Sequence, residues 1–83
     1  MNSLTESEQV LLGNLNNCLA LSQKDLTLEN LGAVYEAYLD IHYAGLDTLL
    51  KLLQDVKPAK QWLDVNRELL YQWNDKERSN QNL

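Results

Sequence analysis

The chain has 83 residues and a formal net charge of −5, with one cysteine, one histidine and one proline. This length predicts a single domain whose core supplies no more than roughly 3–5 kcal/mol of stability, and the acidic balance argues against direct binding of nucleic acid or of an anionic membrane. Because there is only one cysteine, the chain cannot form an internal disulfide framework. A lone thiol, together with the lack of an apolar leader after Met1, predicts a cytoplasmic protein.

The first predicted helix covers residues 5–21. Apolar side chains recur along it at helical spacing, and Cys18 lies among them. A hydroxyl followed three residues later by Glu, the capping-box pattern, occurs at both Ser3 and Thr5, so the first residue of the helix stays open between these two. Gly13 and several Asn residues are weak helix formers, which predicts that packing rather than intrinsic propensity holds this helix.

The second predicted helix covers residues 28–56 and is the longest. Acidic residues occupy the side of the helical wheel opposite the apolar side, as in an amphipathic helix. The apolar phase persists across Ala44 and Gly45, which predicts one uninterrupted helix about 43 Å long; a kink at Gly45 is the alternative. The apolar side comprises Leu31, Val34, Tyr35, Tyr38, Ile41, His42, Leu46, Leu49, Leu52, Leu53 and Val56.

The third predicted helix covers residues 58–75, with Pro58 in its first turn, where the missing N–H costs nothing. Its apolar stripe is interrupted by Asn66 and includes both tryptophans. Residues 76–83 are predicted to be a frayed polar tail. Short connections make successive helices antiparallel, so residues 1–75 are predicted to form one domain, an up-down-up three-helix bundle with a long central helix.

No pattern in the chain predicts catalysis. His42 is the only histidine, and Leu39 stands where a di-iron helix would place Glu, three residues before the histidine. Cys18 has no neighbour in the sequence that would stabilise a thiolate, and the glycine patterns of nucleotide-binding loops are absent. We therefore expect no enzyme activity, no cofactor and no metal site, and we interpret His42 and Cys18 as structural residues.

Three carboxylates and four apolar side chains of residues 28–56 form the predicted partner-binding site. Tyr43 falls on the acidic side of the wheel, next to leucines at the edge of the apolar side, and an apolar centre with a charged rim is typical of protein-binding surfaces. The alternatives are an ordinary solvated face and leucines covered by the first helix. The site comprises Glu36, Leu39, Asp40, Tyr43, Leu46, Asp47 and Leu50.

Two short stretches, residues 12–18 and 55–62, are similar to segments of the small haemolysin-modulating regulators of enteric bacteria. Together they cover less than a fifth of the chain. The spacing between them departs from that family, and a whole helix of the family would be missing. The chain is therefore assigned to no family from its sequence.

Small size, acidity and an extended amphipathic helix predict a non-enzymatic protein-binding regulator, such as an inhibitor, adaptor or chaperone. We expect it to dock on a protein with a basic surface through the central helix, by analogy with regulators encoded by phages and plasmids. Two alternatives stay open. One is a structural homodimer that buries surplus apolar surface against its own copy, and the other is a DNA-mimic inhibitor of a nucleic-acid-binding protein.

Overall fold

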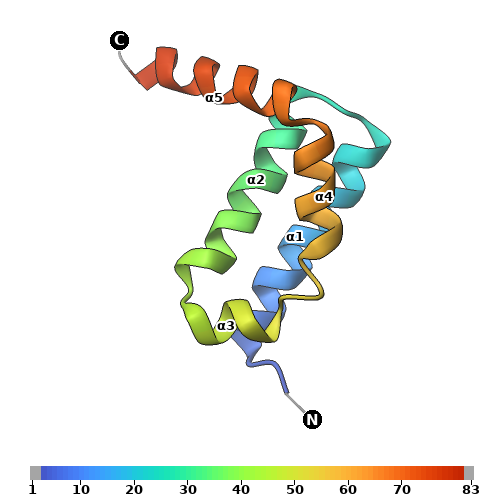
Figure 1. The fold of residues 1–83 in the computed structure, drawn as a ribbon, viewed down its shortest axis with the longest axis vertical. Helices are drawn as coiled ribbons and strands as arrows, with labels where there is room; N and C mark the ends of the chain where they lie inside the picture. The colour runs from blue at the N-terminus through green and yellow to red at the C-terminus, as the bar shows by residue number, and fades with distance from the viewer. Residues whose placement is uncertain (1–2, 82–83) are drawn as a thin grey trace.

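A computed structural model describes residues 3–81 and shows five helices and no strand within that range (Figure 1). The predicted all-α class is therefore confirmed. α2 lies at the centre and contacts each of the other helices, and the molecule measures 45 × 28 × 18 Å along its principal axes. The helices are α1 (Glu6–Lys24), α2 (Leu28–Tyr43), α3 (Leu46–Lys51), α4 (Lys57–Val65) and α5 (Arg67–Gln81).

Side-chain caps define where the first two helices begin. The Thr5 hydroxyl accepts a hydrogen bond from the Glu8 N–H (3.1 Å), and Glu8 Oε1 accepts one from the Thr5 N–H (2.9 Å). This reciprocal capping box selects Thr5 over Ser3 as the start of α1. At α2, the Thr27 hydroxyl accepts a hydrogen bond from the Asn30 N–H (3.0 Å). Both helices therefore begin where a hydroxyl satisfies a backbone donor that has no partner within the helix.

The predicted uninterrupted helix over residues 28–56 is wrong. α2 ends two residues before Gly45, which adopts φ 120° and ψ 166°, a conformation almost confined to glycine. The chain then forms α3 and a run of turn residues, 52–56, before α4 begins. The apolar period survives the break because Leu52 and Val56 return to the same core as α2. The pattern located Leu52 and Val56 in the core although the helix is broken, but His42, Leu46 and Leu53, which it placed on the same apolar side, are exposed.

The predicted helix over residues 58–75 is interrupted at Asn66. The side-chain amide of Asn66 donates to the Trp62 carbonyl (2.9 Å) at the end of α4, and the backbone of Asn66 leaves helical geometry at φ −105° and ψ 26°. α5 then departs from α4 at an angle and crosses the N-terminal end of α2 (Figure 1). The predicted three-helix up-down-up topology is therefore not confirmed.

The polar tail that was predicted to fray from residue 76 is helical as far as Gln81. One contact explains part of this order: the Lys76 ammonium group lies 3.2 Å from a carboxylate oxygen of Glu29, so α5 is tied to the first turn of α2. Residues 82–83, which the prediction also included in the tail, lie outside the described range.

The hydrophobic core lies where α1, α2 and α4 meet, and the turn after α3 contributes to it. At one end of the core, Trp73 of α5 packs on Gly32 of α2, where a Cβ atom would overlap the indole ring. In the middle, the Trp62 indole N–H donates to the buried hydroxyl of Ser22 (2.9 Å) and joins α4 to α1. The core comprises Leu15, Leu19, Leu31, Val34, Ala37, Ile41, Leu52, Val56, Ala59 and Leu63.

Within the part of the chain that the structure describes, no helix is both long and apolar enough to cross a membrane.

Candidate functional site

The predicted site is split between two helices that meet at the turn around Gly45. Leu39 is half-buried, whereas the other six residues of the predicted site are exposed. The break does not bury them: after the turn, α3 lies across the C-terminal end of α2 (Figure 1), and these side chains stay exposed. α2 carries Glu36, Leu39, Asp40 and Tyr43, and α3 carries Leu46, Asp47 and Leu50.

Three large apolar side chains project into solvent at this turn. Tyr43, Leu46 and Leu50 are 80, 69 and 59% exposed, respectively. Leu46 and Leu50 are one helical turn apart and therefore lie on the same side of α3. We call these three residues, together with Asp40 and Asp47, the α2–α3 corner. The alternative in which the first helix covers the leucines is wrong for Leu46 and Leu50.

A further exposed leucine follows α3. Leu53, which the prediction placed on the apolar side of the helix, lies in the turn after α3 and is 46% exposed. On the side that faces the core, Leu49 packs against the core and Leu52 is fully buried. The corner therefore presents an apolar strip that the core has not used.

A buried carboxylate holds α3 in place. Besides capping α1, Glu8 accepts hydrogen bonds from the Thr48 hydroxyl (2.8 Å) and the Lys51 ammonium group (3.2 Å), and only 5% of this residue is exposed. Hydrogen bonds from the Thr5 N–H and the Thr48 hydroxyl, and then the charge of Lys51, hold the pKa of Glu8 at about 2, below its ordinary value of 4.5. We call this set the Glu8 clamp. No residue of α3 is itself buried, and the hydrogen bonds to Glu8 from Thr48 and Lys51 join α3 to α1.

The charge around the α2–α3 corner is negative. Its carboxylates, Asp40 and Asp47, are exposed, and Glu36 lies one turn before Asp40 on the same side of α2. The ion pairs among the described residues are Lys51 with Glu8 and Lys76 with Glu29, so neither involves a corner carboxylate. The only cation of α3, Lys51, is thus turned towards Glu8, and the corner keeps its negative charge.

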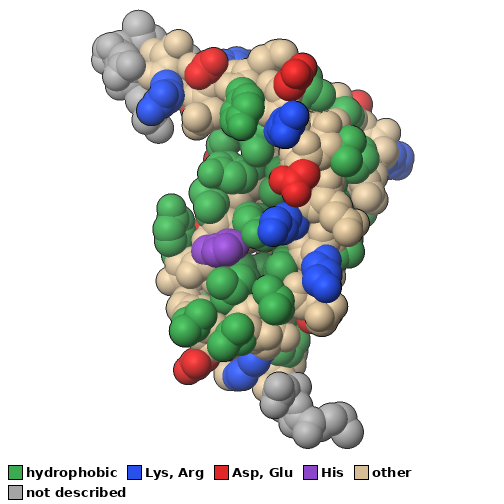
Figure 2. All heavy atoms as spheres, in the orientation of Figure 1, with side chains coloured by type: hydrophobic (Ala, Val, Ile, Leu, Met, Phe, Trp, Pro, Cys, Tyr) green, Lys and Arg blue, Asp and Glu red, His purple; other side chains and the backbone are tan. Residues whose placement is uncertain are grey.

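A second feature, which the sequence analysis missed, is an apolar groove of about 320 Å³ between α2, α4 and α5. Figure 2 shows hydrophobic side chains in the hollow between these helices and Lys and Arg side chains along α4, beside it. We call it the tyrosine groove. It is lined by Tyr35, Tyr38, Lys60, Leu63, Asp64, Arg67, Leu70 and Tyr71.

Aromatic contacts support the α2 wall of the tyrosine groove. Tyr35 meets Trp73 edge to face, with ring centroids 6.0 Å apart, and Tyr38 meets His42 in the same manner at 4.5 Å. His42 is therefore exposed and packed against one ring, rather than enclosed in the core. The prediction had placed both tyrosines on the apolar side of the helix, and the structure packs them against the core while they also line the groove.

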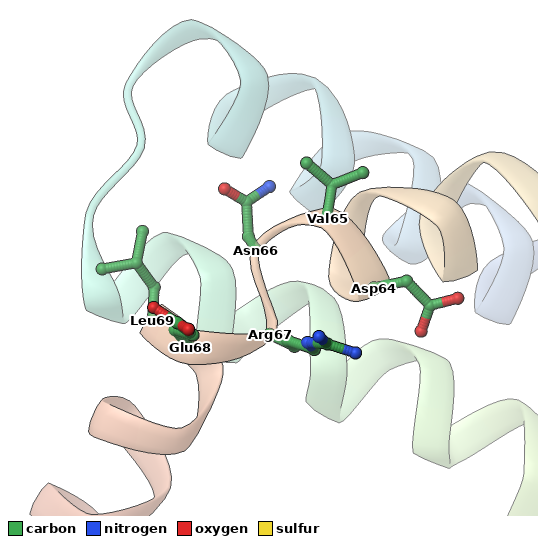
Figure 3. Close-up of a pocket in the computed structure, with 6 residues that line it drawn as sticks. All are labelled: Asp64, Val65, Asn66, Arg67, Glu68 and Leu69. Carbon is green, nitrogen blue, oxygen red and sulfur yellow. The ribbon is translucent and has the colours of Figure 1, made fainter.

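A larger hollow, of about 430 Å³, lies at the junction of α4 and α5 but brings no distant residues together. It is lined by the consecutive residues 64–69, and Figure 3 shows their side chains spreading in different directions from the bend at Asn66. Asp64 and Arg67 point to the same side in that view, towards the tyrosine groove that they also line. This hollow is a consequence of the bend and offers no convergent chemistry.

Within residues 3–81, no group of three or more His, Cys, Asp or Glu side chains comes close enough to hold a metal ion. Cys18 is half-buried, and burial together with the nearby charge of Glu36 raises the pKa of its thiol, which disfavours the reactive thiolate. Comparison with protein-family models, curated proteins and solved structures found no match. The surface of the molecule is therefore what indicates its function.

Proposed function

We propose that the protein is a non-enzymatic regulator that binds another protein through the α2–α3 corner. The observation that carries this proposal is the exposure of Tyr43, Leu46 and Leu50 within eight consecutive residues. Tyrosine is enriched among the residues that dominate binding energy, and an apolar centre flanked by charge is typical of such surfaces. Burying these side chains against a partner would remove apolar area from water at about 25 cal/mol per Å².

The partner that fits the corner has a basic surface. Asp40, Asp47 and Glu36 surround the apolar side chains with negative charge, and Lys51 is held by Glu8 rather than by these carboxylates. Complementary charge around an apolar contact speeds association and orients the partner, while the apolar contact supplies most of the affinity. The Glu8 clamp keeps α3 folded before binding, which reduces the ordering cost of association.

The test is photo-crosslinking from the surface, in cells of the organism that encodes the protein. A benzoyl-phenylalanine placed at Tyr43 or Leu50 should crosslink the partner, which mass spectrometry then identifies. The same probe at Val10 or Val65, which are 67 and 80% exposed on other helices, should not. Equal crosslinking from all four positions would show only nonspecific contact and would reject the corner.

A pair of variants then separates binding from folding. Tyr43→Ala with Asp40→Lys should abolish capture of the crosslinked partner by the purified protein and leave the far-UV circular dichroism spectrum unchanged, because both side chains are exposed. The matched control, Val10→Ala with Asp75→Lys, removes one exposed apolar side chain and reverses one exposed carboxylate elsewhere. Unchanged capture by the first variant would contradict the proposal.

A further inference from the structure

The α2–α3 corner and the tyrosine groove are complementary in shape and charge. The corner projects Tyr43 and two leucines and carries carboxylates, whereas the groove is a concave apolar surface. Lys60 and Arg67 line the groove, and Lys57 lies one turn before Lys60 on the same side of α4. Two of the seven Lys and Arg residues of an otherwise acidic chain thus line this groove, and a third lies one helical turn from it.

We propose that the protein forms a symmetric dimer in which the corner of each copy docks into the tyrosine groove of the other. The inference rests on one part of the proposed function, that the corner binds a protein with a basic surface, and it assigns a second copy of this chain as that protein in place of a different one. Opposite charges face each other in this arrangement, with Asp40 and Asp47 of one copy against Lys60 and Arg67 of the other. Asp64, the one carboxylate in the groove, reduces this attraction without cancelling it.

The position of the two surfaces favours a closed dimer over an open chain of molecules. Figure 2 shows the hydrophobic side chains over α3 and those in the hollow between α2 and α4 on one face of the molecule. When two complementary surfaces share a face, a two-fold axis can satisfy both contacts at once, and two-fold dimers are the commonest oligomers. Each contact then occurs twice, which strengthens an association whose individual surfaces are small.

The groove is also prepared to receive a side chain. Tyr35 and Tyr38 are held by Trp73 and His42, so the α2 wall does not need to be ordered on binding. A groove of about 320 Å³ is at the lower end of the range for ligand sites and suits a few side chains from an exposed turn. Tyr43, the most exposed residue of the corner, is the side chain that we assign to the groove.

A charge-swap experiment tests the dimer. Wild type should sediment as a dimer, and the two charge-reversed variants, D40K/D47K and K60E/R67E, should each be monomers at the same concentration. Each variant places like charges in both contacts, and we expect its dissociation constant to rise at least about tenfold at low salt. An equimolar mixture of the two variants should form a heterodimer, because both of its contacts again pair opposite charges.

The control K24E/R78E changes the net charge by the same amount as K60E/R67E at exposed positions away from the groove, and it should remain a dimer. Circular dichroism of every variant checks that the helices are retained. Three results would overturn the dimer: a monomeric wild type at millimolar concentration, a dimer that neither reversal affects, or a mixture that stays monomeric. Each of the last two would assign the groove to another occupant, such as an acidic segment of a different protein.

Failure of the dimer can be told apart from failure of the proposed function. A monomeric wild type that still crosslinks a different protein from Tyr43 rejects the dimer and leaves the binding role of the corner intact. The wild type can instead form a dimer that responds to the charge reversals as expected, while a probe at Tyr43 crosslinks only to a second copy. That result supports the dimer and rejects the binding of another protein.

Discussion

Among the described residues, the side chain of Glu8 takes part in the most hydrogen bonds. It completes the cap of α1 and also accepts hydrogen bonds from Thr48 and Lys51 of α3, some forty residues away in the sequence. A nearly buried carboxylate is stable only when its charge is compensated in this way. One side chain therefore joins the first turn of the chain to the helix that carries half of the corner.

The pH dependence of folding should report the Glu8 clamp. The pKa of Glu8 is about 2 in the folded protein, whereas the unfolded chain has the ordinary value of 4.5. As the pH falls, Glu8 is therefore protonated in the unfolded chain before it is protonated in the folded protein. The stabilising contribution is therefore complete above about pH 4.5 and is lost progressively towards pH 2. We expect the free energy of unfolding, measured by urea titration, to fall over this interval less steeply in Glu8→Gln than in wild type.

The control for this prediction is Glu6→Gln, which changes an exposed carboxylate in the same first turn of α1. It should leave the slope of stability against pH close to that of wild type. Parallel slopes for wild type and Glu8→Gln would contradict the assignment of the clamp.

Gly45 decides the path of the chain at the α2–α3 corner. Its φ of 120° with ψ of 166° is strained for any residue with a Cβ atom, so Gly45→Ala should destabilise the protein by about 1–3 kcal/mol. Gly13→Ala is the matched control, because no atom lies within 4 Å of the added Cβ and Gly13 is inside α1. The control should stabilise the protein by about 0.5–1 kcal/mol. Urea unfolding of the two variants measures both effects, and a neutral Gly45→Ala would contradict the observed turn.

At the scale of the elements, α3 and α5 depend on others for their order. α3 is too short to be stable alone, because isolated helices shorter than about 12–15 residues are marginal in water. It is held by the Glu8 clamp on one side and by Leu49 on the other. α5 is attached to α2 through Trp73, Tyr35 and the exposed Lys76–Glu29 pair. Because exposed ion pairs contribute little, the indole is the main attachment of α5.

The docking of α5 should therefore be sensitive to the size of residue 32. Gly32→Ala places a Cβ atom in the ring of Trp73, and overpacking of this kind costs about 1–3 kcal/mol. The cost should be much smaller when Trp73→Leu is also present, because the smaller side chain no longer overlaps the Cβ. A double-mutant cycle by urea unfolding measures this coupling. Additive effects of the two substitutions would contradict the packing of Trp73 on Gly32.

At the scale of the whole molecule, one core connects α1, α2 and α4 with the turn after α3. Small domains with one continuous core unfold cooperatively, without populated intermediates. Both tryptophans report on this core, Trp62 through Ser22 and Trp73 through Gly32. Loss of helical circular dichroism and of native tryptophan fluorescence should therefore coincide in a urea titration. Two separate transitions would show that α4 and α5 unfold independently of the α1–α2 pair.

The uneven distribution of charge is also a property of the whole molecule. The chain carries a net charge of −5, yet Lys60 and Arg67 line the tyrosine groove while Asp40 and Asp47 lie at the corner. Separated positive and negative surfaces orient two associating molecules more strongly than the net charge of each molecule does. The binding of a basic partner at the corner and the docking of the corner into the groove of a second copy should therefore both weaken as salt is added.

Local sequence rules predicted the elements well where neighbouring residues decide the structure. Thr5 with Glu8, and Thr27 at the start of α2, cap helices as expected, because a cap depends on residues three positions apart. Periodicity also placed Leu31, Val34 and Ile41 in the core. Periodicity left open whether the first helix covers Leu46 and Leu50, and only the structure shows that both are exposed beside Tyr43.

The breaks at Gly45 and Asn66 could not be derived from periodicity. A helix that bends back and a helix that runs straight can bury the same stripe of side chains, so Leu52 and Val56 fit either path. The choice depends on contacts between residues far apart in the chain, such as Glu8 with Thr48 and Trp73 with Gly32. The tyrosine groove was missed for the same reason, because it exists only once α5 departs from the line of α4.

The sequence by itself determined that this is an acidic, all-helical domain, that its second helix begins after Thr27 and that its first begins after one of two hydroxyl residues, because these properties depend on composition and on residues within one or two helical turns. Only the tertiary structure decided the direction of the chain after Tyr43 and Val65 and the surface that results, with its projecting corner and its aromatic groove. Directions are selected by the packing of distant side chains, and no local pattern records that packing.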